Sequence, residues 1–90
     1  MKAYFNIAGT TFADFHEISH TIKIGDEVQA VPEPTNPYDK QAIALYYKGL
    51  KIGYVPKGMF TLNNEFTMKV HSLNLYNGEA VGAHIETEIA

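Results

Sequence analysis

Three short segments of the chain carry residue types that could do chemistry. Residues 16–20 read His-Glu-Ile-Ser-His and match H-E-x-x-H, in which a helix places two imidazoles on a zinc ion and the glutamate beside the metal-bound water. Residues 33–39 combine two prolines and a threonine with an asparagine, a tyrosine and two carboxylates. Residues 52–57 carry a glycine within an apolar run, followed by a tyrosine and a lysine.

The H-E-x-x-H match needs a helix, whereas the residues around it predict a strand. Residues 17–24 alternate between apolar and polar types up to a turn signal at Gly25. In a strand His16 and His20 share a face and Glu17 points the other way, so the glutamate could not act on a metal-bound water. Helical spacing of the neighbouring Phe and Ile residues keeps the alternative open. We expect no metal site, and a partly buried or edge position for His20.

Residues 33–39 have the chemistry of a tight turn. Pro37 fits the second position of a turn, and the Asn36 side chain can bond the backbone two residues further on. This geometry holds Tyr38 at the tip with the Asp39 carboxylate beside it. A tyrosine can stack on a base or donate to a phosphate, and a carboxylate can accept from a hydroxyl. The segment predicts either a recognition loop or a structural turn with Tyr38 folded back.

The segment around Gly53 predicts a close contact inside the fold. A glycine within a strand indicates a bulge or the close approach of another backbone. Tyr54 and Lys57 follow directly and could serve a phosphate. The alternative is the end of an ordinary core strand.

Composition excludes several classes of protein. The 90 residues include no Cys, which rules out disulfides, zinc knuckles and thiol nucleophiles. Ser19 and Ser72 each lie next to a His, but adjacent strand residues point to opposite faces. The sequence contains neither a signal segment nor an apolar run of about 18 residues. We therefore expect a cytoplasmic binding protein with no cofactor, not an enzyme.

The charge of the chain is acidic overall and uneven along its length. All seven cations are Lys, and the formal net charge is −3, whereas nucleic-acid-binding proteins are usually basic and Arg-rich. Residues 40–70 differ, because they hold five Lys and only one acidic residue, Glu65. This stretch predicts either a local cationic face or solubilising lysines scattered over strands.

The apolar pattern predicts about seven antiparallel strands with short connections. We expect them over residues 2–8, 17–24, 27–32, 41–47, 50–55, 65–76 and 79–89. Asn77-Gly78 is a strong hairpin signal, since a type I′ turn needs positive φ at both positions; Lys48-Gly49 is a second turn. In the second strand the pattern places Ile18, His20, Ile22 and Ile24 on one face; in the last strand the predicted inward residues are Val81, Ala83, Ile85 and Ile89. The pattern is typical of an all-β, OB-like or SH3-like antiparallel barrel with at most one short helix.

Four blocks of the sequence resemble the HIRAN domain family in their order and spacing. They are Gly9-x-x-Phe12, Ile24-Gly25-Asp26-x-Val28, Glu33-Pro34-x-Asn36-Pro37-Tyr38-Asp39-x-x-Ala42-Ile43 and Ile52-Gly53-Tyr54-Val55-Pro56. The resemblance covers roughly residues 4–62, and residues 65–90 carry no matching motif. It implies a single HIRAN-like domain over residues 1–90, with the OB-like barrel found on helicase-like chromatin remodellers and in free-standing bacterial or phage proteins.

The resemblance also implies a ligand, because in the remodellers this domain binds the 3′-hydroxyl end of single-stranded DNA. By position, Asn36 and Asp39 would engage the terminal nucleotide, with Asp39 accepting from the 3′-hydroxyl. Phe12 would stack on the terminal base, and Tyr38 would stack or contact the backbone. The phosphates would lie along Tyr54 and Lys57.

Two positions depart from the pattern of the DNA-end binders. Thr11 stands where they have an Arg, and Tyr54 stands where they have a His. Both changes remove cationic contacts, and phosphate contacts dominate nucleic-acid affinity, so we expect weaker and strongly salt-dependent binding. The lysines that could compensate in part are Lys40, Lys48, Lys51 and Lys57.

Two functions stay open at this point. The first is a module that binds single-stranded DNA 3′ ends in DNA repair or replication-fork processing. The second is a protein-interaction module that acts in trans with a separate helicase or nuclease and does not bind DNA ends. The missing arginines and the net charge of −3 favour the second.

Overall fold

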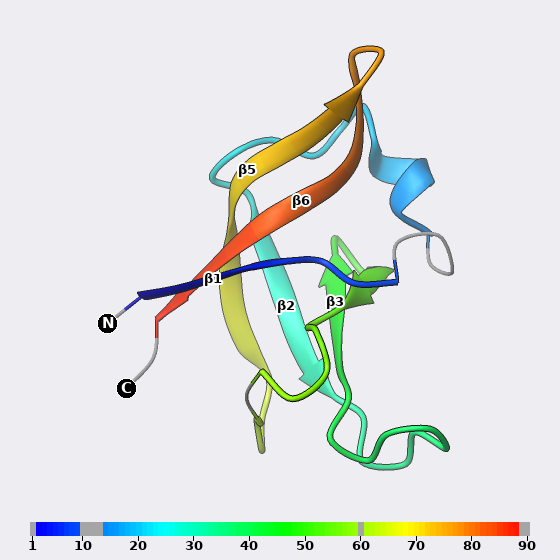
Figure 1. The fold of residues 1–90 in the computed structure, drawn as a ribbon, viewed down its shortest axis with the longest axis vertical. Coiled ribbons are helices and arrows are strands. Elements are labelled where there is room, and N and C mark those ends of the chain that lie inside the picture. The colour runs from blue at the N-terminus through cyan, green and yellow to red at the C-terminus, as the bar shows by residue number, and fades with distance from the viewer. Residues whose placement is uncertain (1, 10–13, 60, 89–90) are drawn as a thin grey trace.

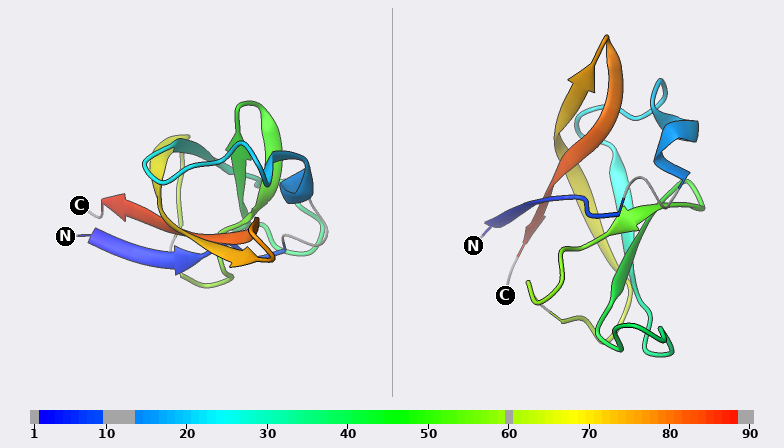
Figure 2. Two further views of the ribbon diagram at one scale, coloured as in Figure 1. Left: turned by 90° about the horizontal axis from the view of Figure 1, so that it is seen from above. Right: turned by 45° about the vertical axis from the view of Figure 1, so that its right-hand side comes forward.

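The computed structural model describes residues 2–9, 14–59 and 61–88, and its strands form one curled antiparallel sheet. The elements are β1 (Lys2–Asn6), the 3₁₀ helix η2 (Asp14–Ile18), β2 (Glu27–Pro32), β3 (Ile43–Tyr47), β4 (Leu50–Tyr54), β5 (Phe66–Tyr76) and β6 (Glu79–Glu88). The strand order is β1-β6-β5-β2-β3-β4 (Figure 1). The sheet curls into a half-barrel (Figure 2), which confirms the predicted all-β, barrel-like fold with one short helix.

The two ends of the sheet meet at one bridge, which joins the chain after β1 to the end of β4. The Ala8 and Tyr54 backbones each donate to the other's carbonyl oxygen, both at 2.8 Å. Gly53 lies beside this bridge with φ +153°, and a Cβ there would lie 2.7 Å from the Ala8 carbonyl oxygen and closer still to Ile7. The close approach predicted at Gly53 is therefore confirmed, and β3 and β4 also shift register here.

A single apolar core fills the inside of the curl. Its members come from every strand and from η2, which covers one end and contacts β4 and β6. β5 pairs with β2, and β6 pairs with β1 from Lys2 opposite Glu88 to Asn6 opposite His84, so the last third of the chain completes the sheet. The largest side chains that are fully buried in this core are Tyr47, Phe15, Leu45, Ile52, Met68, Ile85, Val28 and Val70.

The segment between β1 and β2 is a 3₁₀ helix followed by turns, so the predicted strand over 17–24 is wrong. Ile22 N donates to the Ile18 carbonyl oxygen at 3.0 Å, which is a helical contact. Phe15, Ile18 and Ile22 are buried at helical spacing, whereas Ile24 is 67% exposed. In so short a segment the apolar residues fit both the spacing of a helix and the alternation of a strand. Packing on the core selects the helical spacing. The sheet therefore has six strands.

η2 spans only five residues. In the described part of the chain no helix is long and apolar enough to cross a membrane.

Both predicted two-residue turns have the backbone geometry of type I′. Asn77 and Gly78 have φ +51° and +80°, and Lys48 and Gly49 have φ +50° and +84°. Positive φ at both positions matches the right-handed twist of the flanking strands. These turns fix the register of the β5–β6 and β3–β4 hairpins at their ends.

A bulge in β6 overturns one part of the predicted inward face. The register of β5 and β6 shifts near the hairpin tip and leaves Val81 as an extra residue. The extra residue interrupts the alternation, so Val81 is 52% exposed instead of facing inward. Beyond the bulge the prediction is confirmed, because Ala83 and Ile85 are fully buried; Ile89 lies outside the described residues.

Replacing Gly53 with alanine is expected to destabilise the protein by about 3 kcal/mol or more, from overpacking against Ala8 together with a disfavoured φ. Gly49→Ala is the matched control, since Gly49 has φ +84° but nothing within 4 Å of a Cβ. The control is expected to lose only about 1–2 kcal/mol. Urea unfolding measures both, and equal losses would contradict the close contact.

The buried Tyr47 ties the core to the turn that precedes β2. Its hydroxyl donates to Asp26 Oδ2 at 2.6 Å, and the backbone N–H of Lys23 donates to the same oxygen at 2.9 Å. Burial, together with the hydrogen bond to Asp26, raises the pKa of Tyr47 to about 12. The bond from Tyr47, followed by the one from Lys23, lowers the pKa of Asp26.

The raised pKa of Tyr47 predicts a loss of stability in alkali. The folded pKa lies above the unfolded value, so the contribution of Tyr47 is fully present below about pH 10 and is lost towards pH 12. The free energy of unfolding should fall by on the order of 2 kcal/mol from this group. Urea unfolding at pH 7, 10, 11 and 12 should show a smaller alkaline loss for Tyr47→Phe. The matched control, Tyr46→Phe, should behave as wild type. If Tyr47→Phe loses as much stability in alkali as Tyr46→Phe does, the prediction is wrong.

Candidate nucleic-acid interface

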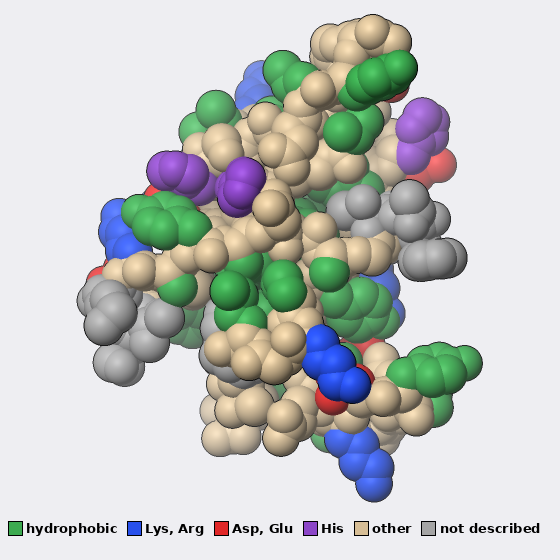
Figure 3. Space-filling model, viewed as in Figure 1, with side chains coloured by type: hydrophobic (Ala, Val, Ile, Leu, Met, Phe, Trp, Pro, Cys, Tyr) green, Lys and Arg blue, Asp and Glu red, His purple; other side chains and the backbone are tan. Residues whose placement is uncertain are grey.

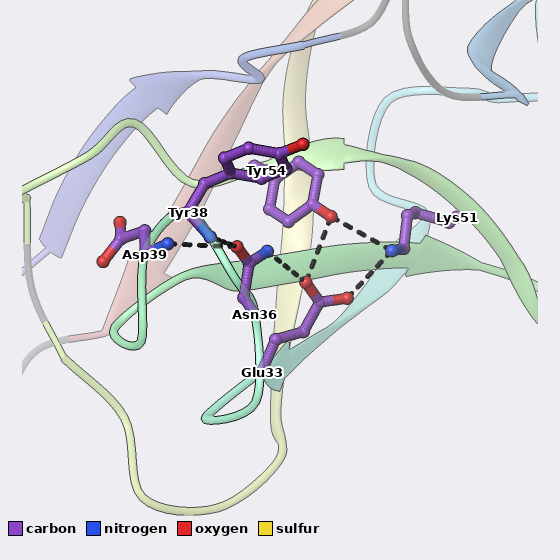
Figure 4. Close-up of polar contacts among 6 residues, drawn as sticks. All are labelled: Glu33, Asn36, Tyr38, Asp39, Lys51 and Tyr54. Atoms are coloured by element: carbon purple, nitrogen blue, oxygen red, sulfur yellow. Dashed lines mark hydrogen bonds and ion pairs between the residues drawn. The ribbon is translucent and has the colours of Figure 1, made fainter.

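The loop between β2 and β3 is shaped by the side chain of Asn36. Asn36 Oδ1 accepts from the backbone N–H groups of Tyr38 and Asp39 at 2.8 and 3.0 Å (Figure 4). Its amide nitrogen donates to Glu33 Oε1 at 3.0 Å. The turn predicted from Asn36 and Pro37 is confirmed. All three hydrogen bonds that the Asn36 side chain makes to described residues lie within the loop, which favours a structural role for this side chain.

Glu33 fastens this loop to β4. Its Oε2 accepts from Lys51 Nζ at 2.8 Å, and its Oε1 accepts from the Tyr54 hydroxyl at 3.1 Å. Lys51 Nζ also donates to the Tyr54 hydroxyl at 3.1 Å, which completes a triangle of polar groups (Figure 4). The sequence analysis missed this role of Glu33. Its position three residues before Asn36, at the start of the turn, was the available signal.

The electrostatics of this triangle keep Glu33 and Lys51 ionised. Burial opposes ionisation of Glu33, but hydrogen bonds from Lys51, Asn36 and Tyr54 outweigh it and lower the pKa of Glu33. The hydrogen bond to Glu33, followed by the one to Tyr54, raises the pKa of Lys51. At neutral pH the Lys51 charge is therefore neutralised within the protein. Lys51 is not the free compensating cation that the sequence analysis expected.

One depression beside the loop brings together every predicted site residue that the structure describes. It has a volume of about 540 Å³, and its lining includes Ala8, Gly9 and Val55 at and next to the closing bridge. The predicted residues in its lining are Asn36, Tyr38, Asp39, Tyr54 and Lys57. The other two predicted residues, Thr11 and Phe12, lie outside the described part of the chain.

The side chains of this depression differ in how much of their surface and hydrogen-bonding capacity a ligand could use. Tyr38 is 92% exposed, so it is displayed and not folded back onto the barrel. Asp39 Oδ1 accepts from the Gln41 backbone N–H at 2.9 Å, and among the described residues the carboxylate has no other hydrogen bond. The hydroxyl of Tyr54 is already engaged, which leaves its ring beside Tyr38 (Figure 4).

The lysines of the middle segment do not form one cationic face. Lys57 lines the depression and Lys40 lines the neighbouring one, and both are exposed. Lys48 lies at the β3–β4 turn, in a different depression that also contains Asp26. Figure 3 shows basic side chains interspersed with acidic and hydrophobic ones around the β2–β3 loop. The scattered arrangement is therefore the better description.

The H-E-x-x-H segment does not form a helical metal site. η2 ends at Ile18, so His16 and Glu17 lie on the helix and His20 lies beyond it. His20 is exposed, against the expected partly buried or edge position, and its Nε2 lies 3.2 Å from Glu79 Oε1. Within residues 2–9, 14–59 and 61–88, no group of three or more His, Asp or Glu could hold a metal ion.

Replacing Glu33 with glutamine is expected to lower the free energy of unfolding by about 1–3 kcal/mol at pH 7, because Lys51 loses its charged partner. The pKa of Glu33 is lowered by folding, so its contribution is present above the unfolded value near 4.5 and is lost as the pH falls through the folded value. The difference from wild type should therefore shrink below about pH 4.5.

Urea unfolding at pH 7 and at pH 3 checks this expectation. Glu17→Gln is the matched control, since Glu17 is exposed on η2 and the described residues offer it no ion pair. A deficit in Glu33→Gln that is the same at both pH values would contradict the ionised triangle.

The model of the HIRAN domain family matches residues 2–61 of the 90 residues. The match includes the β2–β3 loop, β4 and every residue of the depression described above. No curated protein and no solved structure was found to match the chain. The HIRAN domain is known as a DNA-binding module, and it is a binding domain, not a catalytic one. The chain belongs to the HIRAN domain family.

Proposed function

We propose that the depression beside the β2–β3 loop binds the 3′-hydroxyl end of single-stranded DNA. The observation that carries this proposal is the gathering of an exposed tyrosine, a carboxylate and a lysine around one depression in a HIRAN domain. The role we propose is in DNA repair or replication-fork processing, with a helicase or nuclease on a separate chain as the partner.

Tyr38 would provide the stacking surface. Its ring is 92% exposed, while the backbone N–H beneath it is fixed by Asn36, so a base could stack without displacing any protein contact. Stacking of a base on an aromatic side chain contributes about 1–3 kcal/mol. Phe12 would stack on the terminal base from the segment after Gly9, a residue of the depression.

Asp39 would read the terminal hydroxyl. One oxygen is held by Gln41, which orients the carboxylate, and the other can accept from a hydroxyl donor. The same negative charge repels a terminal phosphate. This supports selectivity for a 3′-hydroxyl over a 3′-phosphate.

The phosphates would be contacted by few cations. Lys57 and Lys40 are exposed near the loop, Lys51 is held by Glu33, and Thr11 brings no charge. For single strands the logarithm of the affinity changes with the logarithm of salt by about −0.7 per phosphate contacted. Two contacts therefore give a slope of about −1.4, which is shallow for a DNA-binding protein and replaces the strong salt dependence expected from the sequence.

Fluorescence anisotropy tests the proposal, with a short labelled single strand at about 50 mM salt. The three ligands are a free 3′-hydroxyl end, a 3′-phosphate end and a recessed 3′ end in a duplex. We expect the tightest binding to the free 3′-hydroxyl. Tyr38→Ala should weaken it by about 5- to 150-fold, as the loss of one stacked base predicts. Asp39→Ala should bring the affinities for 3′-hydroxyl and 3′-phosphate ends close together.

Glu17→Gln on the remote η2 serves as the control and should bind as wild type does. An equal loss on both kinds of end in Asp39→Ala would contradict its role as reader of the hydroxyl. Absence of binding to all three ligands would instead favour the protein-interaction function.

A further inference from the structure

Among the described residues, no strand pairs with the outer edge of β5 along its last five residues. β2 pairs with β5 only from Phe66 to Lys69. The described backbone hydrogen bonds on that side end at Val70, which bonds Gly25 and Asp26 at 2.8 and 2.9 Å. Residues 72–76 then continue as one arm of the β5–β6 hairpin, which projects from the barrel (Figure 1).

The hairpin turn determines which backbone groups this edge presents. Tyr76 and Glu79 flank the two-residue turn, so they form a hydrogen-bonded pair directed towards β6. Backbone groups alternate in direction along a strand. Leu75 and Leu73 therefore direct their N–H and C=O groups outward, away from β6.

This edge lacks the residues that usually protect a strand from pairing. Residues 70–78 contain no Asp, Glu, Lys or Pro. Charged side chains and prolines are the common protection of edge strands. Apolar side chains are instead exposed at the same tip, where Leu75 is 63% and Tyr76 is 69% exposed.

We propose that residues 72–76 pair antiparallel with the same residues of a second copy of this chain, about a two-fold axis at Asn74. In this register Leu73 of one copy lies opposite Leu75 of the other, so the outward backbone groups face one another. The symmetry of the edge argues for a second copy, because the outward groups of Leu73 and Leu75 are complementary to themselves about Asn74. Each molecule carries a net charge of −3, and the neutral edge is a stretch along which two such molecules meet without opposing like charges.

The dimer would leave the proposed DNA sites free. The hairpin tip and the β2–β3 loop lie at opposite ends of the molecule's long axis (Figure 1), so each copy presents its depression away from the other. A contact of one short strand is smaller than the roughly 1,200 Å² of a standard interface. We therefore expect a concentration-dependent dimer with a dissociation constant of about 10–500 μM.

Sedimentation equilibrium between about 10 μM and 1 mM tests the proposal, and charge-swap variants at the axis make it specific. Asn74→Lys places two lysines opposite each other, and Asn74→Asp places two carboxylates opposite each other, so each variant alone should be monomeric. An equal mixture of the two should restore the dimer as a heterodimer. The substitutions remove only an exposed 3.3 Å contact with Asn6, so both should keep the wild-type circular dichroism.

Val81→Lys is the matched control, because Val81 is exposed at the same tip but belongs to β6. It should still form the dimer. A wild-type protein that stays monomeric at 1 mM would overturn the proposal, and so would a mixture that does not recover the dimer. DNA-end affinity at low protein concentration should be the same in Asn74→Lys as in wild type, so failure of the dimer and failure of the proposed DNA function are distinguished.

Discussion

The close contact between Gly53 and Ala8 is the constraint on which the rest of this structure depends. It lets two backbones approach so tightly that the ends of a six-stranded sheet meet at one bridge. Both residues of that bridge, Ala8 and Tyr54, line the depression. Tyr54 belongs to both parts, because its backbone closes the sheet while its hydroxyl binds Glu33. A change at Gly53 would therefore affect the β2–β3 loop as well as the barrel.

The β2–β3 loop is ordered by contacts within the protein itself. Hydrogen bonds run from Lys51 and Tyr54 through Glu33 and Asn36 to the backbone at the tip of the loop. Such preorganisation reduces the entropy lost on binding. It also commits one of the few nearby cations to the protein itself, so shape and stacking would carry a larger share of affinity than charge. Under the proposed function, an acidic chain without arginine would bind DNA ends weakly and with modest salt dependence.

Local signals were enough to predict much of this architecture. The Asn36 turn, the Asn77-Gly78 hairpin and the close approach at Gly53 each follow from residues adjacent in sequence. The contacts that were missed join distant residues: Glu33 and Lys51 are 18 positions apart, and nothing local pairs them. The prediction of a strand over 17–24 was wrong for another reason. The apolar residues there fit the spacing of a helix as well as the alternation of a strand, and only packing on the core decides between them.

The pairing of Lys2 with Glu88 has a consequence for the way such a domain can be carried by other proteins. The first and last paired residues are neighbours across one ladder, so the chain enters and leaves the fold at nearly the same place (Figure 1). A unit with this geometry can be inserted into a surface loop of a host protein by two short connections, and the two ends of that loop need not move apart. The β2–β3 loop, at a distance from this point of attachment, would then face outward from the host.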